Sequence, residues 1–110
     1  MPGPVETRRQ FARLAQPTHR GRSGPLRIHF VEPSESSEEF CVAYAIGKSV
    51  GGAVTRNLIR RRLRALMDEC RAHTLPGLYL IKCGIGTSEL TYDELRHHVR
   101  EALRRAGTFE

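Results

Sequence analysis

The chain has 110 residues, enough for one domain with a modest hydrophobic core. Lys and Arg number 18 against 12 Asp and Glu, so the formal net charge is +6 and the pI is about 9.9. This balance favours an anionic partner, a nucleic acid first and an acidic membrane surface second. An ordinary basic protein without such a partner is the plainer alternative.

The composition also argues against several classes of protein. The three cysteines are far apart and form no CxxC pair, so a disulfide framework and a zinc site are both disfavoured. No apolar run approaches the roughly 20 residues that cross a bilayer, and the N-terminus does not resemble a signal peptide. A reducing cytoplasm is therefore the expected location.

The first 25 residues are expected to contain one short helix. Residues 1–5 carry two prolines and a glycine, which predicts a loose tail. Thr7 and Gln10 have the spacing of a capping box, so a helix should begin there and end at Pro17. Residues 17–25 form a basic segment dense in Gly, Pro and Ser, which predicts a loop.

Two strands are predicted next. In residues 26–31, LRIHFV, apolar and polar side chains alternate, which is typical of a strand with two different faces. Residues 40–46, FCVAYAI, are apolar on both faces except at Tyr44, which predicts a buried strand. Since only a short acidic loop joins these strands, an antiparallel hairpin is their simplest pairing.

Residues 47–74 are predicted to hold a glycine-containing turn and the longest helix. Apolar residues at 54, 58, 59, 63, 66, 67 and 70 follow one helical stripe that should face the core. At about 100° per residue, Arg56, Arg60 and Arg64 form a row displaced from that stripe, with Arg61 beside it. Such close like charges repel one another until phosphates neutralise them, so the row indicates an RNA-binding surface. The alternative is a solvated basic face.

The rest of the chain should add one strand and one helix. Residues 78–83, LYLIKC, predict the strand. Thr91 and Glu94 form a second capping box, and Gly107 should end the helix and leave 106–110 as a loose end. The expected order is helix, two strands, helix, strand, helix, in one α+β domain over residues 1–110. Its helices should pack as a sandwich on a central, mostly antiparallel sheet, and a short extra strand is compatible with this pattern.

The run from Lys48 to Arg64, KSVGGAVTRNLIRRRLR, resembles the signature of the protein subunit of bacterial ribonuclease P. That signature has a lysine-containing turn, a glycine, Ala-Val, Arg-Asn-Arg, an aliphatic residue, a basic pair and a further arginine. Phe11 and the basic residues 20–22 are similar to the family's first helix and the loop after it. Residues 90–95 are similar to the start of its last helix, so the resemblance covers residues 7–105.

The resemblance implies a function. Members of that family join a catalytic RNA in a ribonucleoprotein endonuclease that removes the 5′ leader from precursor tRNA. The RNA performs the hydrolysis with Mg²⁺ that the RNA and the substrate hold, so no catalytic residue and no metal ligand is expected in the protein. The implied partners are the catalytic RNA and precursor tRNA, with no membrane and no obligate protein partner. A left-handed β-α-β crossover is also implied, although right-handed crossovers are the general rule.

The same resemblance implies the site residues. Contacts to the catalytic RNA are expected from Lys48, Arg56, Asn57, Arg60, Arg61 and Arg64. Phe11 and His29 would line a cleft between the first helix and the sheet, where the single-stranded leader passes. A plain core aromatic is the alternative for Phe11. The chain departs from the family pattern at Ala15, Ser49, Gly52 and Leu58, where an aromatic, a lysine, an asparagine and an arginine are usual.

Two other classes of function remain as alternatives. A non-enzymatic RNA-binding protein, ribosomal or architectural, could use the same arginine helix. A basic amphipathic helix that addresses a membrane or a partner groove is less favoured, because so small a domain needs the apolar stripe for its core. The central motif and a processing assay separate the first alternative from the ribonuclease P subunit.

Overall fold

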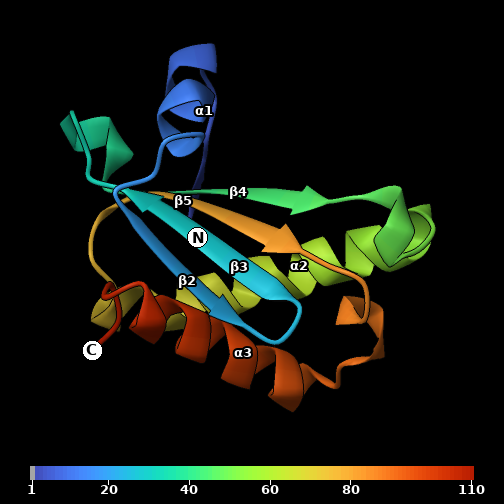
Figure 1. Cartoon of the computed structure of the whole chain (residues 1–110). Coiled ribbons are helices and arrows are strands. Elements are labelled where there is room, and N and C mark those ends of the chain that lie inside the picture. Colours follow the sequence, from blue (N-terminus) through green and yellow to red (C-terminus); the bar gives the residue numbers. More distant parts are fainter. Residues whose placement is uncertain (1) are drawn as a thin grey trace.

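The computed structural model describes residues 2–110, which form a five-stranded sheet and three α-helices (Figure 1). The strands are β1 (Gly3–Pro4), β2 (His19–Ser23), β3 (Leu26–Val31), β4 (Phe40–Ile46) and β5 (Gly77–Cys83). The helices are α1 (Arg8–Leu14), α2 (Ala53–Cys70) and α3 (Tyr92–Arg105). The α+β class and the predicted order of elements are confirmed, with β1 and β2 as additional strands.

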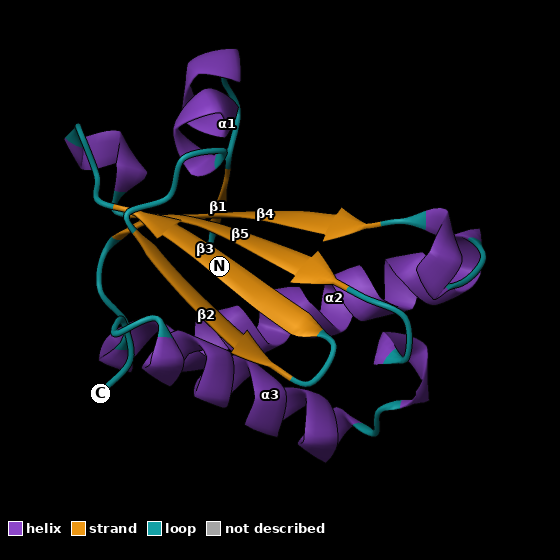
Figure 2. Ribbon diagram, in the orientation of Figure 1, coloured by secondary structure: helices purple, strands orange, loops and turns teal. Residues whose placement is uncertain are grey.

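Helices α2 and α3 cover one face of the sheet, whereas α1 lies at one end of the other face (Figure 2). The alternation in β3 decides which side chains enter the main core: Leu26, Ile28 and Phe30 are buried against α2 and α3. A smaller cluster beneath α1 includes Leu14 and Val31. Most of the second face is therefore left uncovered by helices.

The order of strands is β1-β4-β5-β3-β2, so the sheet is mixed. Strand β3 pairs antiparallel with β2 and β5, while β4 pairs parallel with β1 and β5. The predicted hairpin between residues 26–31 and 40–46 is therefore wrong. The reason is that β2 reaches β3 through a much tighter turn at Gly24, whose φ of 56° suits glycine. The central position is left to β5, which is apolar on both faces from Leu78 to Ile81.

Residues 19–23 form strand β2, not the predicted loop. In the sequence, Gly21 suggests a flexible loop. In the structure, its lack of a side chain allows β2 to lie directly against α3. A Cβ atom at Gly21 would stand 1.9 Å from the carbonyl oxygen of Ala102. Glycine inside a strand often marks such a close approach of two backbones. Arg20 and Arg22 point away from α3 and are exposed. The segment therefore lacks the apolar residues by which a strand is recognised in a sequence.

The β4-α2-β5 unit has the left-handed sense that the family resemblance implied. In Figure 1 both strands run to the right, β5 lies below β4, and α2 passes behind the sheet. This arrangement brings the N-terminal half of α2 to the outer edge of β4. The first turn of α2 projects beyond the sheet, so Val54 is 85% exposed and does not join the predicted apolar stripe.

Both ends of the chain are held, although the sequence predicts loose ends. Gly3 and Pro4 pair with β4, and Val5 is buried in the cluster beneath α1. At the other end Thr108 is buried, and its carbonyl oxygen accepts a hydrogen bond from the Leu75 N–H at 2.9 Å. Each end thus completes part of the sheet or core, so the prediction is wrong for residues 2–5 and 106–110. Residue 1 lies outside the described residues.

Helices α1 and α3 begin at their predicted capping boxes. The Thr7 hydroxyl accepts from the Gln10 N–H at 3.1 Å, and the Gln10 side chain accepts from the Thr7 N–H at 3.1 Å. Thr91 and Glu94 make the same reciprocal pair at the start of α3.

No helix among residues 2–110 has the length and apolar character that a membrane crossing requires.

Candidate nucleic-acid interface

The first feature of the interface is the arginine row of α2, defined as Arg56, Arg60 and Arg64. These residues lie on successive turns, and all three are partly exposed. The Arg56 Nε donates to the Gly51 carbonyl oxygen at 3.1 Å, and the Arg60 guanidinium donates to Asn57 Oδ1 at 2.8 Å. Asn57 therefore orients Arg60, in addition to any contact of its own.

The other predicted residues of this region lie around the row. Lys48 and Arg61 are exposed, Lys48 in the short 3-10 turn that precedes α2. Leu58 is half-buried and offers no charge at the position where the family pattern has arginine. Arg62 does not replace that charge in the row, since its guanidinium lies over the ring of Tyr92 on α3, 5.9 Å from the ring centroid.

A groove of about 660 Å³ joins the arginine row to α1 and the edge of β4. We call it the arginine groove, and its lining includes Phe11, Ala43, Tyr44, Arg60, Arg64 and Leu80. Phe11 is 46% exposed, so it is not a plain core aromatic. The groove exists because β1 pairs only with Cys41 and Val42 and leaves the rest of the β4 edge uncovered.

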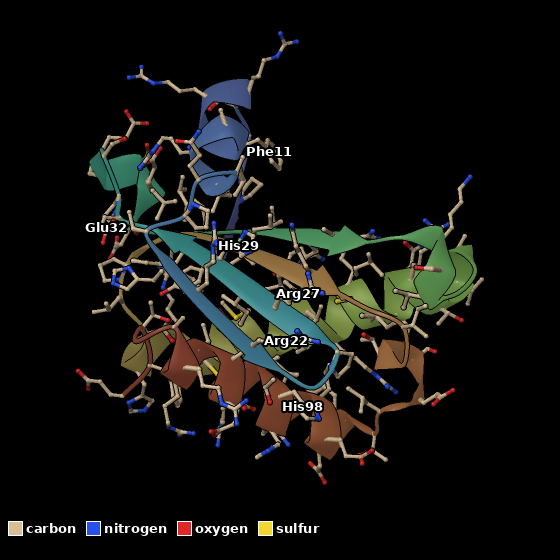
Figure 3. The ribbon with its side chains drawn as sticks, viewed as in Figure 1. Phe11, Arg22, Arg27, His29, Glu32 and His98 are labelled. Atoms are coloured by element: carbon tan, nitrogen blue, oxygen red, sulfur yellow. The ribbon has the colours of Figure 1, made fainter. Side chains whose placement is uncertain are left out.

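The second feature is the basic sheet face, defined as Arg20, Arg22, Arg27, His29 and Lys82. Strand register places Arg20 beside His29 and Arg22 beside Arg27, and Arg27 is in turn the neighbour of Lys82 on β5. Figure 3 shows Arg22, Arg27 and His29 on the face that α2 and α3 leave open. Two hollows, of about 400 and 560 Å³, follow these residues along the face.

The sequence patterns did not identify the four cations of the basic sheet face as site residues. The alternation in residues 26–31 already placed Arg27 on the same face as His29, and Lys82 is the charged residue of an apolar strand. Arg20 and Arg22 gave no such signal, because their segment was predicted to be a loop. The structure also separates Phe11 from His29: they line different hollows.

His29 has an unmet hydrogen-bonding group within the basic sheet face. Its Nδ1 is buried and has no partner among residues 2–110. Burial lowers the pKa of His29, and the charges of Lys82, Arg20 and Arg27 lower it further, while the Leu14 carbonyl acts in the opposite direction. A neutral ring is thus favoured at neutral pH. A nucleic-acid group that reached Nδ1 would satisfy it.

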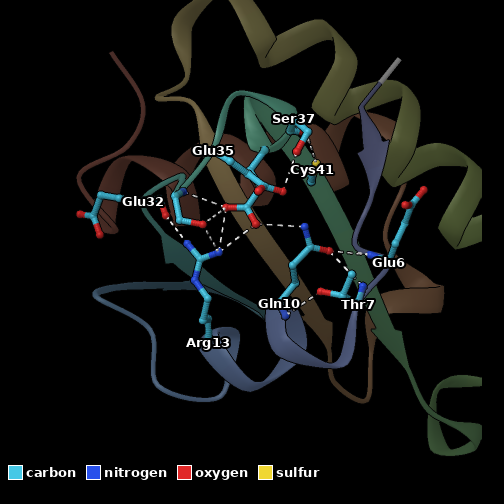
Figure 4. Close-up of polar contacts among 10 residues, drawn as sticks. Glu6, Thr7, Gln10, Arg13, Glu32, Glu35, Ser37 and Cys41 are labelled. Carbon is cyan, nitrogen blue, oxygen red and sulfur yellow. Dashed lines mark hydrogen bonds and ion pairs between the residues drawn. The ribbon is translucent and has the colours of Figure 1, made fainter.

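Helix α1, which carries Phe11, is held in place by a buried carboxylate. Glu38 is 2% exposed and accepts from the Arg13 guanidinium at 2.7 and 2.9 Å, from the Gln10 side chain at 3.0 Å and from the Ser34 N–H at 2.8 Å (Figure 4). Burial alone raises the pKa of Glu38, but these hydrogen bonds together lower it to about 2. Glu38 is therefore ionised at neutral pH and fixes one wall of the arginine groove.

The arginines on the outer surface of α3 differ from those of the two basic features because they form ion pairs. Arg96 and Arg100 both pair with Glu69, and Arg104 pairs with Glu101. These arginines are largely neutralised by acidic neighbours. Among the described residues, the ion pairs found do not include the arginine row or the cations of the basic sheet face. The arginine row and the basic sheet face thus keep their positive charge available to a partner.

The part of the chain that the structure describes does not fit a protein-held metal or a thiol nucleophile. No three His, Cys, Asp or Glu residues among 2–110 are placed to hold a metal ion. Cys41, Cys70 and Cys83 are free thiols, and burial raises the pKa of each, that of Cys83 to about 11. The geometry supports contact with an anionic polymer better than chemistry by these side chains.

Known proteins share both the sequence and the fold. Residues 4–107 match the family model described as Ribonuclease P. The ribonuclease P protein component of Streptomyces avermitilis is 35% identical over 85 residues, which cover 76% of this chain and 68% of the relative. That of Roseiflexus sp. strain RS-1 is 29% identical over 108 residues, which cover 96% and 87%. The RNase P protein of Staphylococcus aureus, at 18% identity, superposes with a TM-score of 0.82 over 96% of each chain, a likeness of fold.

Proposed function

Since the chain belongs to the ribonuclease P protein family, and so is a protein component of the enzyme that matures the 5′ end of tRNA, we propose that its two basic features bind different RNAs. The arginine row, with Lys48, Asn57 and Arg61, anchors the protein on the catalytic RNA. Phe11, His29 and the basic sheet face hold the 5′ leader of precursor tRNA. The observation that carries the proposal is that Phe11, Arg60 and Arg64 line one groove.

The groove and the sheet face suit single-stranded RNA for a physical reason. An exposed aromatic ring can stack on any base, and guanidinium groups pair with phosphates whatever the sequence. The leader is held by such contacts without a strict choice of bases. Because Phe11 and the arginine row face the same groove, the leader and the catalytic RNA approach each other at the edge of β4.

The RNA subunit performs the hydrolysis in this proposal, and the protein supplies no catalytic group. Mg²⁺ is held by phosphates of the RNA subunit and of the substrate. The positive charge of Mg²⁺ bound there would stabilise the transition state of the hydrolysis. The reaction belongs in the cytoplasm, with the precursor tRNA.

A processing assay tests the proposal. The protein is mixed with a transcribed bacterial ribonuclease P RNA and a precursor tRNA at low Mg²⁺ concentration, where the RNA alone is slow. Stimulated release of the 5′ leader is expected. Binding of the RNA without stimulation would favour a purely structural RNA-binding protein. Cleavage by the protein alone would contradict the assignment of the chemistry to the RNA.

A further inference from the structure

Tyr44 is the one polar side chain in the apolar strand β4, and the proton of its hydroxyl has no acceptor. The residue lines the arginine groove beside Arg60 and Arg64. Its hydroxyl oxygen is buried, and its proton has no acceptor among residues 2–110. The other buried tyrosine behaves differently, because the Tyr79 hydroxyl donates to the Leu75 carbonyl oxygen at 2.6 Å.

An unpartnered phenol is unfavourable for the fold. Buried tyrosine hydroxyls normally find a partner, and leaving one unmatched destabilises the folded state. The ring of Tyr44 packs against the main core, and a phenylalanine ring could pack there in the same way. The proton of the hydroxyl therefore makes no hydrogen bond in the free protein.

Arg64 can donate to this hydroxyl but cannot accept its proton. Burial raises the pKa of Tyr44 to about 12, although the charge of Arg64 and hydrogen bonding from its side chain act to lower it, so the phenol keeps its proton at neutral pH. A guanidinium has only donors, and it offers no acceptor to the phenolic hydrogen. What the hydroxyl lacks is an acceptor oxygen, of the kind that every RNA phosphate and ribose carries.

We infer that the Tyr44 hydroxyl donates a hydrogen bond to the oxygen of the catalytic RNA that Arg64 binds, which makes Tyr44 a further residue of the RNA anchor. This inference rests on the proposed function of the arginine row. Arg64 is long, flexible and half-exposed, and it lies next to the phenol. As its guanidinium turns outward to a phosphate, it uncovers the hydroxyl beside that same phosphate.

The substitution Tyr44→Phe removes the hydroxyl and keeps the ring. Binding to a transcribed ribonuclease P RNA is expected to weaken about tenfold, the effect of one hydrogen bond to a charged group. The dependence of affinity on salt should stay the same, because a neutral phenol displaces no counterion. The thermal unfolding midpoint of the free protein should rise by several degrees, because a buried unmatched group is gone. Tyr92→Phe on α3, beside Arg62 and Arg96, is the matched control and should not weaken RNA binding.

The expected pattern is weaker RNA binding by a more stable protein, which a merely structural role does not produce. The inference is overturned if Tyr44→Phe binds the RNA as tightly as the parent protein. It is also overturned if that variant unfolds at a lower temperature, or if only binding of leader-bearing substrate weakens. The variant Arg64→Ala distinguishes failure of the role of Tyr44 from failure of the proposed RNA anchor. If Arg64→Ala weakens RNA binding and Tyr44→Phe does not, the arginine anchor stands and the role of Tyr44 fails.

Discussion

The three guanidiniums of the arginine row are restrained by different neighbours. Arg56 is tied to the backbone at Gly51 and Arg60 to the side chain of Asn57, whereas Arg64 lies beside the phenol of Tyr44. A restrained side chain loses less conformational entropy when it binds, so Arg56 and Arg60 are preorganised for phosphate contacts. The position of Arg64 is instead set by the arginine groove that it lines.

Substituting Arg64 or Arg60 with Ala is expected to weaken binding of the catalytic RNA. Each lost phosphate contact should also reduce the slope of log K against log salt by about 0.7–0.9, because one fewer counterion is released. The measurement is a set of binding isotherms at several salt concentrations. Arg104→Ala is the matched control, since Arg104 is exposed on α3 but already paired with Glu101. An unchanged slope in both variants of α2 would place the RNA elsewhere.

Phe11→Ala should weaken binding of leader-bearing precursor tRNA more than binding of mature tRNA. The expected loss is about 1–3 kcal/mol, the usual contribution of one base stacked on an aromatic ring. Affinities of the assembled enzyme for the two substrates provide the measurement. Leu75→Ala is a suitable control, because Leu75 and Phe11 are both 46% exposed and only Phe11 lines the arginine groove. Equal weakening for both substrates would make Phe11 a structural residue.

At the scale of elements, α1 depends on Glu38 for its position. The ordinary pKa of 4.5 falls to about 2 in the fold, which corresponds to about 3 kcal/mol of stability at neutral pH. Glu38→Gln should lose most of that stability in denaturant unfolding and should speed hydrogen exchange within α1. Because the folded pKa is depressed, the contribution is complete above pH 4.5 and is lost as the pH falls towards 2. The difference between parent and variant should therefore shrink across that window.

Glu35→Gln is the control for Glu38, since Glu35 lies in the same acidic segment. It is exposed and accepts a hydrogen bond from the Ser37 hydroxyl at 2.8 Å. Its substitution should change stability by no more than about 0.5 kcal/mol. A similar loss in both variants would show that the segment depends on net charge and not on the buried carboxylate.

Elements with local signals could be predicted from the sequence. The capping boxes at Thr7 and Thr91 depend on residues three positions apart, so they placed α1 and α3 correctly. The strand order could not be read in this way, because the central strand β5 meets partners from distant parts of the chain. The role of Gly21 depends on the backbone of α3, some eighty residues later, and no local pattern carries that information. The unmatched atoms of Tyr44 and His29 likewise became evident only from their surroundings.

At the scale of the whole molecule, charge is divided between two sides. The open face of the sheet and the arginine row carry cations without acidic partners among the ion pairs of the described residues, while α3 carries paired arginines. Lys82→Glu should therefore weaken binding of precursor tRNA to the assembled enzyme by about tenfold or more, since it adds repulsion to a lost attraction. Arg100→Glu makes the same change in net charge on the α3 side. Equal effects of the two variants would mean that only net charge matters.

The central place of β5 has a consequence for the synthesis of the chain. Strands β3 and β4 precede β5 by more than thirty residues, yet they meet only through it. A nascent chain that has not reached residue 83 cannot close its sheet, so its apolar strands stay unprotected while α2 is already complete. An RNA that captured the arginine row at this stage would hold the longest helix in place before the last strand arrived. The order of strands thus delays closure of the sheet until β5 has been synthesised.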